Sequence, residues 1–228
     1  MNLKLKDLVE LLQLPEKTVK TWVEQGKIPS YKIGGQYRFS ESEINEWIIN
    51  NKLKDNLNVS ERIIELSAGK LHVSLTGFLE NGGIFYGIEG GSVSEIINNC
   101  VNRMKIPEGV HRSVLLESLL ERESMMPTAL GKGIAIPHPR NPIITDVENE
   151  SLSICFLNNE IDYGALDGKN VHTLFIVLSA NPKRHLEILS KISFLCQNEE
   201  FMNLLKSRGD PHSITEYLKR KDLEWIKG

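Results

Sequence analysis

Residues 131–140 read GKGIAIPHPR and place one histidine, His138, between two prolines at the end of a short apolar run. Gly131 and Gly133 allow the backbone a positive φ or a close approach to another group. Pro137 fixes φ before the histidine and removes one hydrogen-bond donor. Because the apolar run predicts a short strand, we expect this stretch to present His138 on a stiff strand edge.

A histidine in this position suits two roles. In the first, the neutral imidazole is a nitrogen nucleophile that accepts a phosphoryl group without a metal, provided that cations hold the phosphate oxygens. Arg122, Lys132 and Arg140 are the candidate cations. In the second role, the ring is a structural strand-end histidine that is hydrogen-bonded to a backbone carbonyl. These residues by themselves leave both roles open.

The composition around this motif is that of an ordinary globular protein. The chain has 228 residues, of which 40% are hydrophobic and 25% charged, which suffices for one or two domains. The net charge of -3 argues against a generally basic nucleic-acid coat, although it leaves room for a local patch. Neither a signal-peptide core nor a run of about eighteen apolar residues is found, so we expect a cytoplasmic protein without membrane insertion.

The three cysteines, Cys100, Cys155 and Cys196, lie far apart and have neither CxxC spacing nor the spacing of a Cys/His metal site. We therefore expect buried, reduced thiols and no metal site.

The first fifty residues have the pattern of a small unit with three helices and a hairpin. Apolar residues at helical spacing predict helices near 5–12 and 16–24, and Ser40 with Glu43 forms a capping box for a third helix. The extended residues on either side of Gly34-Gly35 predict a β-hairpin.

The polar stretch NNKLKDNLN, residues 50–58, interrupts this pattern and indicates a linker, although residues 59–70 have the pattern of one more helix. The expected domains are a first domain of residues 1–52, a linker of residues 53–74, a second domain of residues 75–220 and a C-terminal tail of residues 221–228.

Helical and strand patterns alternate from about residue 75 onward. The helical patterns lie at 93–104, 110–122, 185–196 and 214–218, and the apolar strand-like runs at 134–136, 152–157 and 173–178. This alternation predicts an α/β domain whose helices pack on the faces of a sheet.

The segment TALGKGIAIPHPR, residues 128–140, resembles the phosphorylation-site motif of the fructose and nitrogen-regulatory (type 2) enzyme IIA domains of the bacterial phosphotransferase system. Three further segments are similar to that family: LLERES at 119–124, DYGALDGKNVHTLFIVLSA at 162–180 and NPKRHLEILSKISFL at 181–195. The resemblance extends from roughly residue 75 to residue 220 and implies that family's fold, a mixed sheet flanked by helices.

Carried over residue by residue, the resemblance makes His138 the phosphoryl acceptor, His185 its neighbouring imidazole and Arg122 the guanidinium that supports the phosphate. It implies a histidine phosphocarrier protein as the donor. Positioning and charge stabilisation are what in-line transfer requires, so no cofactor is expected. His172 is interpreted as a structural strand-edge residue. Pro139 stands where many family members have glycine, which narrows the access to the nucleophile.

Residues 5–48, LKDLVELLQLPEKTVKTWVEQGKIPSYKIGGQYRFSESEINEWI, resemble the excisionase-like branch of the winged helix-turn-helix family that includes the MerR regulators. The resemblance implies that residues 16–24 are a recognition helix and that residues 32–38 form a wing, so that the helix reads bases while wing cations contact phosphates. The DNA-binding residues that it implies are Lys17, Thr18, Lys20, Thr21, Lys32 and Arg38.

Two departures from this pattern predict fewer phosphate contacts: Pro15 stands where a serine cap is frequent, and Gln36 where the wing often has arginine. Residues 15–38 nevertheless carry five lysine or arginine side chains against two glutamates, a local charge of +3. The alternative to a DNA-binding face is an ordinary solvated face on an interaction module.

We therefore expect a cytoplasmic regulator in which the enzyme IIA-like domain receives phosphate on His138 and the helix-turn-helix domain binds DNA. Since one such module has a small footprint, we expect homodimers on a palindromic site. Two alternatives stay open. The protein could donate phosphate to a separate enzyme IIB in sugar uptake, or it could be a binding-only signalling module without phosphoryl turnover.

Overall fold

The computed structural model describes residues 2–12, 14–41, 43–44, 47–48 and 73–227. The chain divides into two compact units, Met1–Val59 and Ser60–Gly228, so the break falls inside the segment predicted as a linker. Most of that linker, together with the helix predicted at 59–70, lies outside the described residues.

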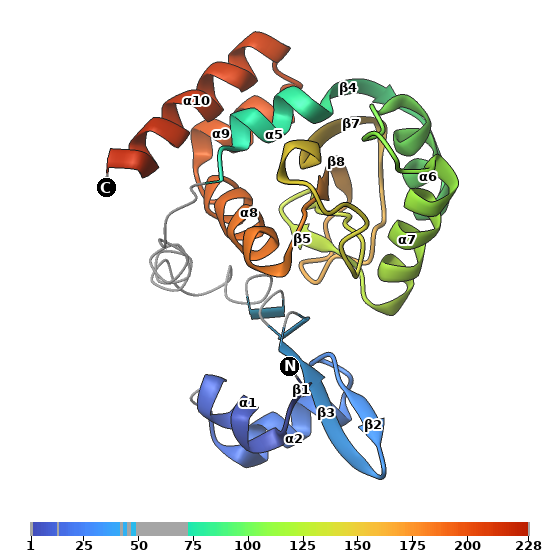
Figure 1. The fold of residues 1–228 in the computed structure, drawn as a ribbon, viewed down its shortest axis with the longest axis vertical. Helices are drawn as coiled ribbons and strands as arrows, with labels where there is room; N and C mark the ends of the chain where they lie inside the picture. Colours follow the sequence, from blue (N-terminus) through green and yellow to red (C-terminus); the bar gives the residue numbers. More distant parts are fainter. Residues whose placement is uncertain (1, 13, 42, 45–46, 49–72, 228) are drawn as a thin grey trace. The chain divides into compact units, whose positions relative to one another are not determined.

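The first unit combines helices with a small antiparallel sheet (Figure 1). Its elements are β1 (Asn2–Leu3), α1 (Leu5–Leu12), α2 (Glu16–Glu24), β2 (Tyr31–Ile33) and β3 (Gln36–Ser40), with the strand order β1-β3-β2. Residues 41, 43, 44, 47 and 48 are also helical, as predicted for a third helix. Leu8, Val19, Phe39 and Ile44 are fully buried and form the core of the unit.

The predicted hairpin is confirmed. Gly34 and Gly35 both have positive φ, 57° and 77°, which a two-residue turn between strands of normal twist requires. Ile33 pairs with Gln36 across the turn. At the other end of the hairpin, the Tyr31 hydroxyl donates to the carboxylate of Glu43, which ties β2 to the third helix.

The second unit is a mixed α/β domain, as predicted. Its elements are α5 (Leu75–Gly82), β4 (Gly83–Ile88), α6 (Val93–Arg103), α7 (Arg112–Met125), β5 (Ala129–Gly131), β6 (Ile134–Ala135), a 3-10 helix (Val147–Asn149), β7 (Ser151–Ile161), β8 (Val171–Leu178), α8 (Pro182–Leu195), α9 (Glu199–Lys206) and α10 (Pro211–Lys227). The sheet has the order β4-β7-β8-β6-β5. The pairs β4/β7 and β6/β8 are parallel, whereas β7/β8 and β5/β6 are antiparallel.

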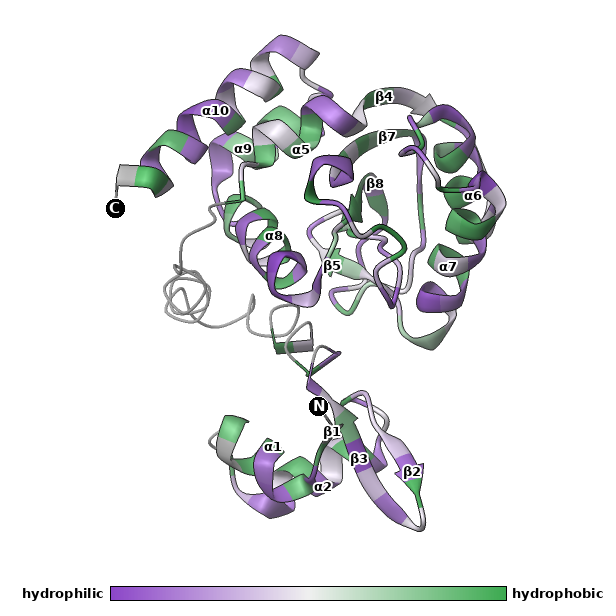
Figure 2. Cartoon of the chain, in the orientation of Figure 1, coloured by the Kyte–Doolittle hydropathy of each residue, from purple (hydrophilic) through white to green (hydrophobic). Residues whose placement is uncertain are grey.

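Helices cover both faces of this sheet (Figure 1). On one face, Ile97 of α6 and Leu115 of α7 belong to a buried cluster with Leu174 and Ile176 of β8. Figure 2 shows the corresponding alternation of hydrophobic and hydrophilic residues along α6 and α7. The capping box predicted for α6 begins that helix, because the Ser92 side chain accepts from the Glu95 amide at 3.3 Å.

The opposite face of β8 is covered by the C-terminal helices. The ring of Phe175 lies 6.3 Å from that of Phe201 in α9, which stacks at 5.0 Å on Tyr217 of α10. Within the described part of the chain, no helix is long and apolar enough to cross a membrane.

A buried ion pair on α8 holds the segment that enters the second unit. Lys191 and Glu187, 2% and 5% exposed, lie 3.3 Å apart between Nζ and Oε1. The Val73 amide donates to Glu187 Oε1 at 2.9 Å, and Lys191 Nζ donates to the Val73 carbonyl. The two side chains therefore satisfy both backbone groups of Val73.

Replacing Lys191 by alanine should lower the free energy of unfolding by about 3–5 kcal/mol, because it leaves the Glu187 carboxylate buried without its cation. Urea denaturation at neutral pH measures the change. The matched control is Lys219→Ala in α10, which removes a half-exposed pair with Glu216 and should leave the midpoint nearly unchanged. Equal effects of the two substitutions would contradict this account of the buried pair.

Candidate functional site

The sheet topology brings the two predicted histidines to one edge. Because β6 and β8 are parallel neighbours, the residues that follow them emerge at the same edge of the sheet. His138 lies three residues after β6, and His185 lies in the first turn of α8, which follows β8. The Val177 amide donates to the Pro137 carbonyl at 3.1 Å, so the backbone before His138 is fixed to β8.

The two imidazole rings lie against each other. Their centroids are 4.7 Å apart and their planes are inclined by 59°. His138 is 2% exposed and His185 is 9% exposed. The stiff strand end that we predicted for His138 is thus a buried position, and the ring of His185 lies beside it.

One hydrogen bond sets the tautomer of His138. Its Nδ1 lies 2.7 Å from the carbonyl oxygen of Ile136, two residues earlier in the chain. A carbonyl oxygen only accepts, so Nδ1 carries the proton and the lone pair of the neutral ring is on Nε2. His185 has a comparable contact, between its Nδ1 and Ser179 Oγ at 3.1 Å. The nitrogen of His138 that can attack an electrophile is therefore Nε2.

Arg122 reaches the same edge from α7. The strand that follows α7, β5, is antiparallel to β6 and pairs Ala129 with Ala135, so the loop between α7 and β5 lies beside the end of β6. Arg122 is 7% exposed and donates from one guanidinium nitrogen to the Met126 carbonyl at 2.9 Å. The structure thus directs to one edge the three side chains for which the enzyme IIA resemblance implies a role.

Sequence reasoning missed a carboxylate in this group, that of Glu123. It accepts hydrogen bonds from the Thr128 amide and the Thr128 hydroxyl, both at 2.6 Å, and from the Tyr163 hydroxyl at 3.3 Å. Burial raises the pKa of Glu123 above its ordinary value, and the Thr128 hydrogen bonds and the Arg122 charge offset only part of this rise. The signal that could have found Glu123 is its position next to Arg122 in LLERES.

A second missed group supports the helix that carries His185. Glu150 is almost fully buried just before β7, and β7 is antiparallel to β8, so Glu150 lies at the same edge. Its carboxylate accepts from Arg184 Nε at 2.6 Å and from the Ala180 amide at 2.9 Å. These bonds fix the first turn of α8, next to His185.

Two further cations were candidates from the sequence, Lys132 and Arg140. Lys132 lies in the turn between β5 and β6, before the start of β6, whereas His138 lies past its end. The Lys132 amine donates to the Cys196 carbonyl at 3.3 Å. Arg140 is exposed, two residues after His138.

His172 has the surroundings of a structural residue, as interpreted from the sequence. It is half-buried, and its Nδ1 lies 2.8 Å from Thr173 Oγ1. Burial lowers its pKa. Gly133 is required beneath it, because a Cβ at that position would lie 2.4 Å from the imidazole ring.

All three cysteines are buried and reduced, which confirms that prediction. Burial raises the pKa of Cys196 to about 12. A thiol of that pKa is a poor nucleophile at neutral pH. Among the residues that the structure describes, no group of three or more His, Cys, Asp and Glu side chains is arranged to hold a metal ion.

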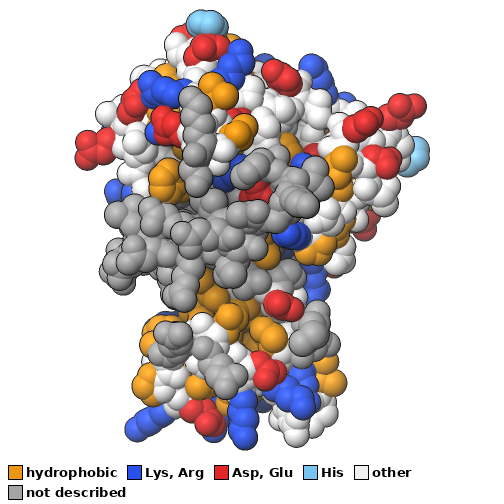
Figure 3. All heavy atoms as spheres, turned by 60° about the vertical axis from the view of Figure 1, so that its left-hand side comes forward, with side chains coloured by type: hydrophobic (Ala, Val, Ile, Leu, Met, Phe, Trp, Pro, Cys, Tyr) orange, Lys and Arg blue, Asp and Glu red, His pale blue; other side chains and the backbone are white. Residues whose placement is uncertain are grey.

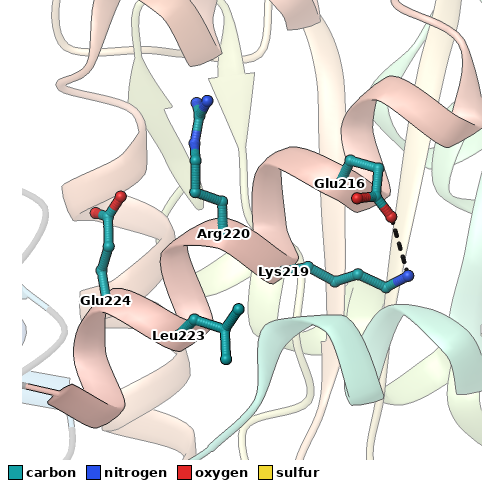
Figure 4. A pocket seen from close by; sticks show the side chains of 5 residues that line it. All are labelled: Glu216, Lys219, Arg220, Leu223 and Glu224. Carbon is teal, nitrogen blue, oxygen red and sulfur yellow. Dashed lines mark hydrogen bonds and ion pairs between the residues drawn. The ribbon is translucent and has the colours of Figure 1, made fainter.

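A pocket on α10 is separate from the histidine pair (Figure 4). Its lining side chains all come from this one helix: Glu216, Lys219, Arg220, Leu223 and Glu224. Charged pairs occupy it, with Lys219 3.0 Å from Glu216 and Arg220 2.6 Å from Glu200 of α9.

In the first unit, the polar positions of α2 differ in their availability. Lys17 is exposed, whereas Lys20 forms an ion pair with Glu16 at 2.7 Å, and its hydrogen bond lowers the pKa of Glu16. Thr18 is half-buried, and the Thr21 hydroxyl donates to the Lys17 carbonyl at 2.9 Å. Among the described residues, Lys20 is the lysine of this helix that pairs with Glu16, and Lys17 is exposed.

The wing cations are held by neighbours on the hairpin. Lys32 lies over the Tyr37 ring, 5.2 Å from its centroid, and Arg38 donates to Gln36 Oε1 at 2.8 Å and to the Tyr37 carbonyl at 3.0 Å. Gln36, which departs from the family pattern, thus orients the arginine. Figure 3 shows Lys and Arg side chains on the visible face of this unit beside Asp and Glu side chains.

Comparisons with known proteins divide the chain in two. Residues 77–221 match the family described as "Phosphoenolpyruvate-dependent sugar phosphotransferase system, EIIA 2", and residues 3–52 match the family described as "Helix-turn-helix domain".

Two relatives illustrate the match. The nitrogen regulatory protein of Pseudomonas aeruginosa is 29% identical over 139 residues, which cover 59% of this chain and 88% of that protein. The mannitol-specific EIICBA component of the phosphotransferase system of Buchnera aphidicola is 26% identical over 186 residues, or 80% of this chain. The matched part is only 28% of the length of that component.

The fold is similar to that of a solved structure, nitrogen regulatory protein IIA-Ntr from Neisseria meningitidis. The TM-score is 0.53 at 23% sequence identity, and the match covers 63% of this chain and 94% of the other. This likeness supports the fold of the second unit.

Replacing Glu123 by glutamine should stabilise the protein increasingly as the pH rises above 4.5, the ordinary pKa of this carboxyl. Because burial raises the pKa of Glu123 in the folded protein, the folded state binds the carboxyl proton more tightly than the unfolded state does. As the pH rises from the unfolded pKa to the folded pKa, the contribution of this carboxyl to the free energy of unfolding therefore decreases. Glutamine has no such proton to lose.

Urea denaturation of both proteins between about pH 4 and about pH 8 measures the difference in unfolding free energy. The exposed neighbour Glu121, changed to glutamine, serves as the control and should show no such trend. A wild-type advantage that grows with pH would contradict the raised pKa.

Proposed function

The chain belongs to the enzyme IIA type 2 family of the phosphoenolpyruvate-dependent sugar phosphotransferase system, and we propose that its His138 accepts a phosphoryl group from a histidine phosphocarrier protein. The observation that carries this proposal is the 2.7 Å contact between His138 Nδ1 and the Ile136 carbonyl, which leaves the lone pair on Nε2. A neutral imidazole with this tautomer is a competent nitrogen nucleophile.

In the proposed step, the lone pair of Nε2 forms a bond to the phosphorus of the donor's phosphohistidine. The N–P bond of the donor breaks in line, and its electron pair returns to the donor imidazole. The acceptor ring gains positive charge, which the hydrogen bond from Nδ1 to the Ile136 carbonyl stabilises. Arg122 and His185 supply hydrogen-bond donors for the equatorial oxygens.

The burial of His138 adds a requirement to this step. With the ring 2% exposed, a donor reaches Nε2 only when side chains around it move as the donor docks. The ring of His185, with its centroid 4.7 Å away, is one of these neighbours.

For the first unit we propose DNA binding and a regulatory role in the cytoplasm. Residues 3–52 match a helix-turn-helix domain, and Lys17, Lys32 and Arg38 lie on its helix α2 and its hairpin. Phosphorylation adds about -1.5 to -2 charges at neutral pH, which can alter docking or homodimer formation. The relative named as a nitrogen regulatory protein is matched over 88% of its length, which fits this role.

The second candidate function is phosphate donation to an enzyme IIB partner in sugar uptake. The relative named as a mannitol-specific component favours it. The helix-turn-helix match favours the regulator. Transfer of labelled phosphate from this protein to an isolated enzyme IIB would support the transport role.

Replacing His138 by alanine should abolish phosphorylation by phosphoenolpyruvate and the general carrier proteins, because the accepting nitrogen is removed. Acid-labile label on the protein is the measurement. The matched control is His212→Ala, an exposed histidine at the start of α10, which should be labelled like the wild type. Label that persists in the His138 variant would assign the acceptor to another residue.

Replacing Lys17 or Arg38 by alanine should reduce the slope of log affinity for DNA against log salt by roughly one unit, because each cation neutralises one phosphate. Fluorescence anisotropy with duplex DNA at several salt concentrations measures the slope. Lys105→Ala, an exposed lysine of the second unit, should leave it unchanged. Absence of any salt-dependent binding by the wild type, phosphorylated or not, would contradict DNA binding.

A further inference from the structure

Two adjacent residues at the end of α7 hold the loop that leads into β5. Arg122 donates to the Met126 carbonyl at 2.9 Å. The next residue, Glu123, accepts from both the amide and the hydroxyl of Thr128 at 2.6 Å. Thr128 is 2% exposed, whereas Glu123 is half-buried. Residues 126–128 are thereby fixed to the helix end that carries Arg122.

A continuous series of hydrogen bonds leads from Glu123 to the ring of His138. The Thr128 carbonyl accepts from the Ile136 amide at 3.0 Å, and the Ile136 carbonyl receives His138 Nδ1 at 2.7 Å. Glu123 thus holds Thr128, Thr128 holds the peptide of Ile136, and Ile136 holds the imidazole. A shift of Thr128 changes the position of the carbonyl that determines the tautomer of His138.

We propose that Glu123 is a positioning residue for His138, which holds the Thr128–Ile136 backbone where the Ile136 carbonyl keeps the proton on Nδ1 and the lone pair on Nε2. This inference rests on the proposed function insofar as it concerns phosphoryl transfer. The tautomer itself is a property of the unphosphorylated protein.

Two chemical properties of Glu123 can be separated by substitution. Glutamine keeps the shape, since its carbonyl can accept from the Thr128 amide while its amide group donates to the Thr128 hydroxyl, which accepts as well as donates. Alanine removes both bonds. If geometry is the contribution of Glu123, glutamine substitutes for it and alanine does not. If its negative charge were the contribution, glutamine would fail as alanine does.

The experiment records ¹⁵N spectra of the histidine rings in the full-length unphosphorylated protein, together with the rate of phosphorylation by the phosphocarrier. We expect one tautomer, protonated on Nδ1, in the wild type and in Glu123→Gln. We expect a mixture of tautomers in Glu123→Ala and a transfer rate lower by roughly 10- to 100-fold, since small misplacements of a reacting group have effects of that size.

Two further variants complete the test. Thr128→Val removes the hydroxyl contact with Glu123 and keeps the amide contact, so its transfer rate should decrease less than that of Glu123→Ala. If circular dichroism shows that Glu123→Ala does not fold, Thr128→Val takes its place in the test. Glu121→Ala removes an exposed carboxylate from the same helix and should match the wild type.

Two results would overturn the positioning role. The first is a folded Glu123→Ala variant with a single Nδ1-protonated tautomer and an undiminished transfer rate, or, if that variant does not fold, wild-type behaviour of Thr128→Val. The other is a transfer rate in Glu123→Gln that is as low as that of Glu123→Ala. If the wild type accepts no phosphoryl group, the proposed function fails, and the tautomers of the variants still decide whether Glu123 positions the ring.

Discussion

The hydrogen bond between His138 Nδ1 and the Ile136 carbonyl is the interaction on which the proposed chemistry depends. It joins the ring to the carbonyl of a residue only two positions earlier, just past the end of β6. The Thr128–Ile136 and Pro137–Val177 hydrogen bonds fix that backbone from both sides. A lone pair on Nε2 is therefore a consequence of strand pairing and is independent of any phosphate ligand.

Buried or half-buried carboxylates accept backbone amides at three places in the second unit. Glu123 accepts the Thr128 amide, Glu150 the Ala180 amide and Glu187 the Val73 amide. Each bond satisfies a donor that would otherwise be costly to bury. Two of these carboxylates act on α8: Glu150 pairs with Arg184 at its first turn, and Glu187 belongs to the helix itself. The helix that supplies the second imidazole therefore also holds Val73, where the chain enters the described part of the second unit.

Sequence patterns predicted the elements whose signals are local. The capping residues Ser92 and Glu95 indicated the start of α6, and the paired glycines 34 and 35 indicated the hairpin. Strand β4, whose sequence GIFYGI contains two glycines, and helix α9 were not predicted. In the site, the motif indicated His138, His185 and Arg122. The bond from Glu123 to Thr128 and the burial of His138 depend on how the loop after α7 and the first turn of α8 pack, which periodicity does not contain.

The most direct test of the central claim is to find which ring nitrogen of His138 carries phosphorus after phosphorylation by phosphoenolpyruvate and the general carrier proteins. In protein with ¹⁵N-labelled histidine, coupling between ³¹P and ¹⁵N identifies the bonded nitrogen. The account predicts a bond to Nε2 of His138, with Nδ1 still facing the Ile136 carbonyl. A bond to Nδ1, or phosphorus on His185 in place of His138, would contradict it.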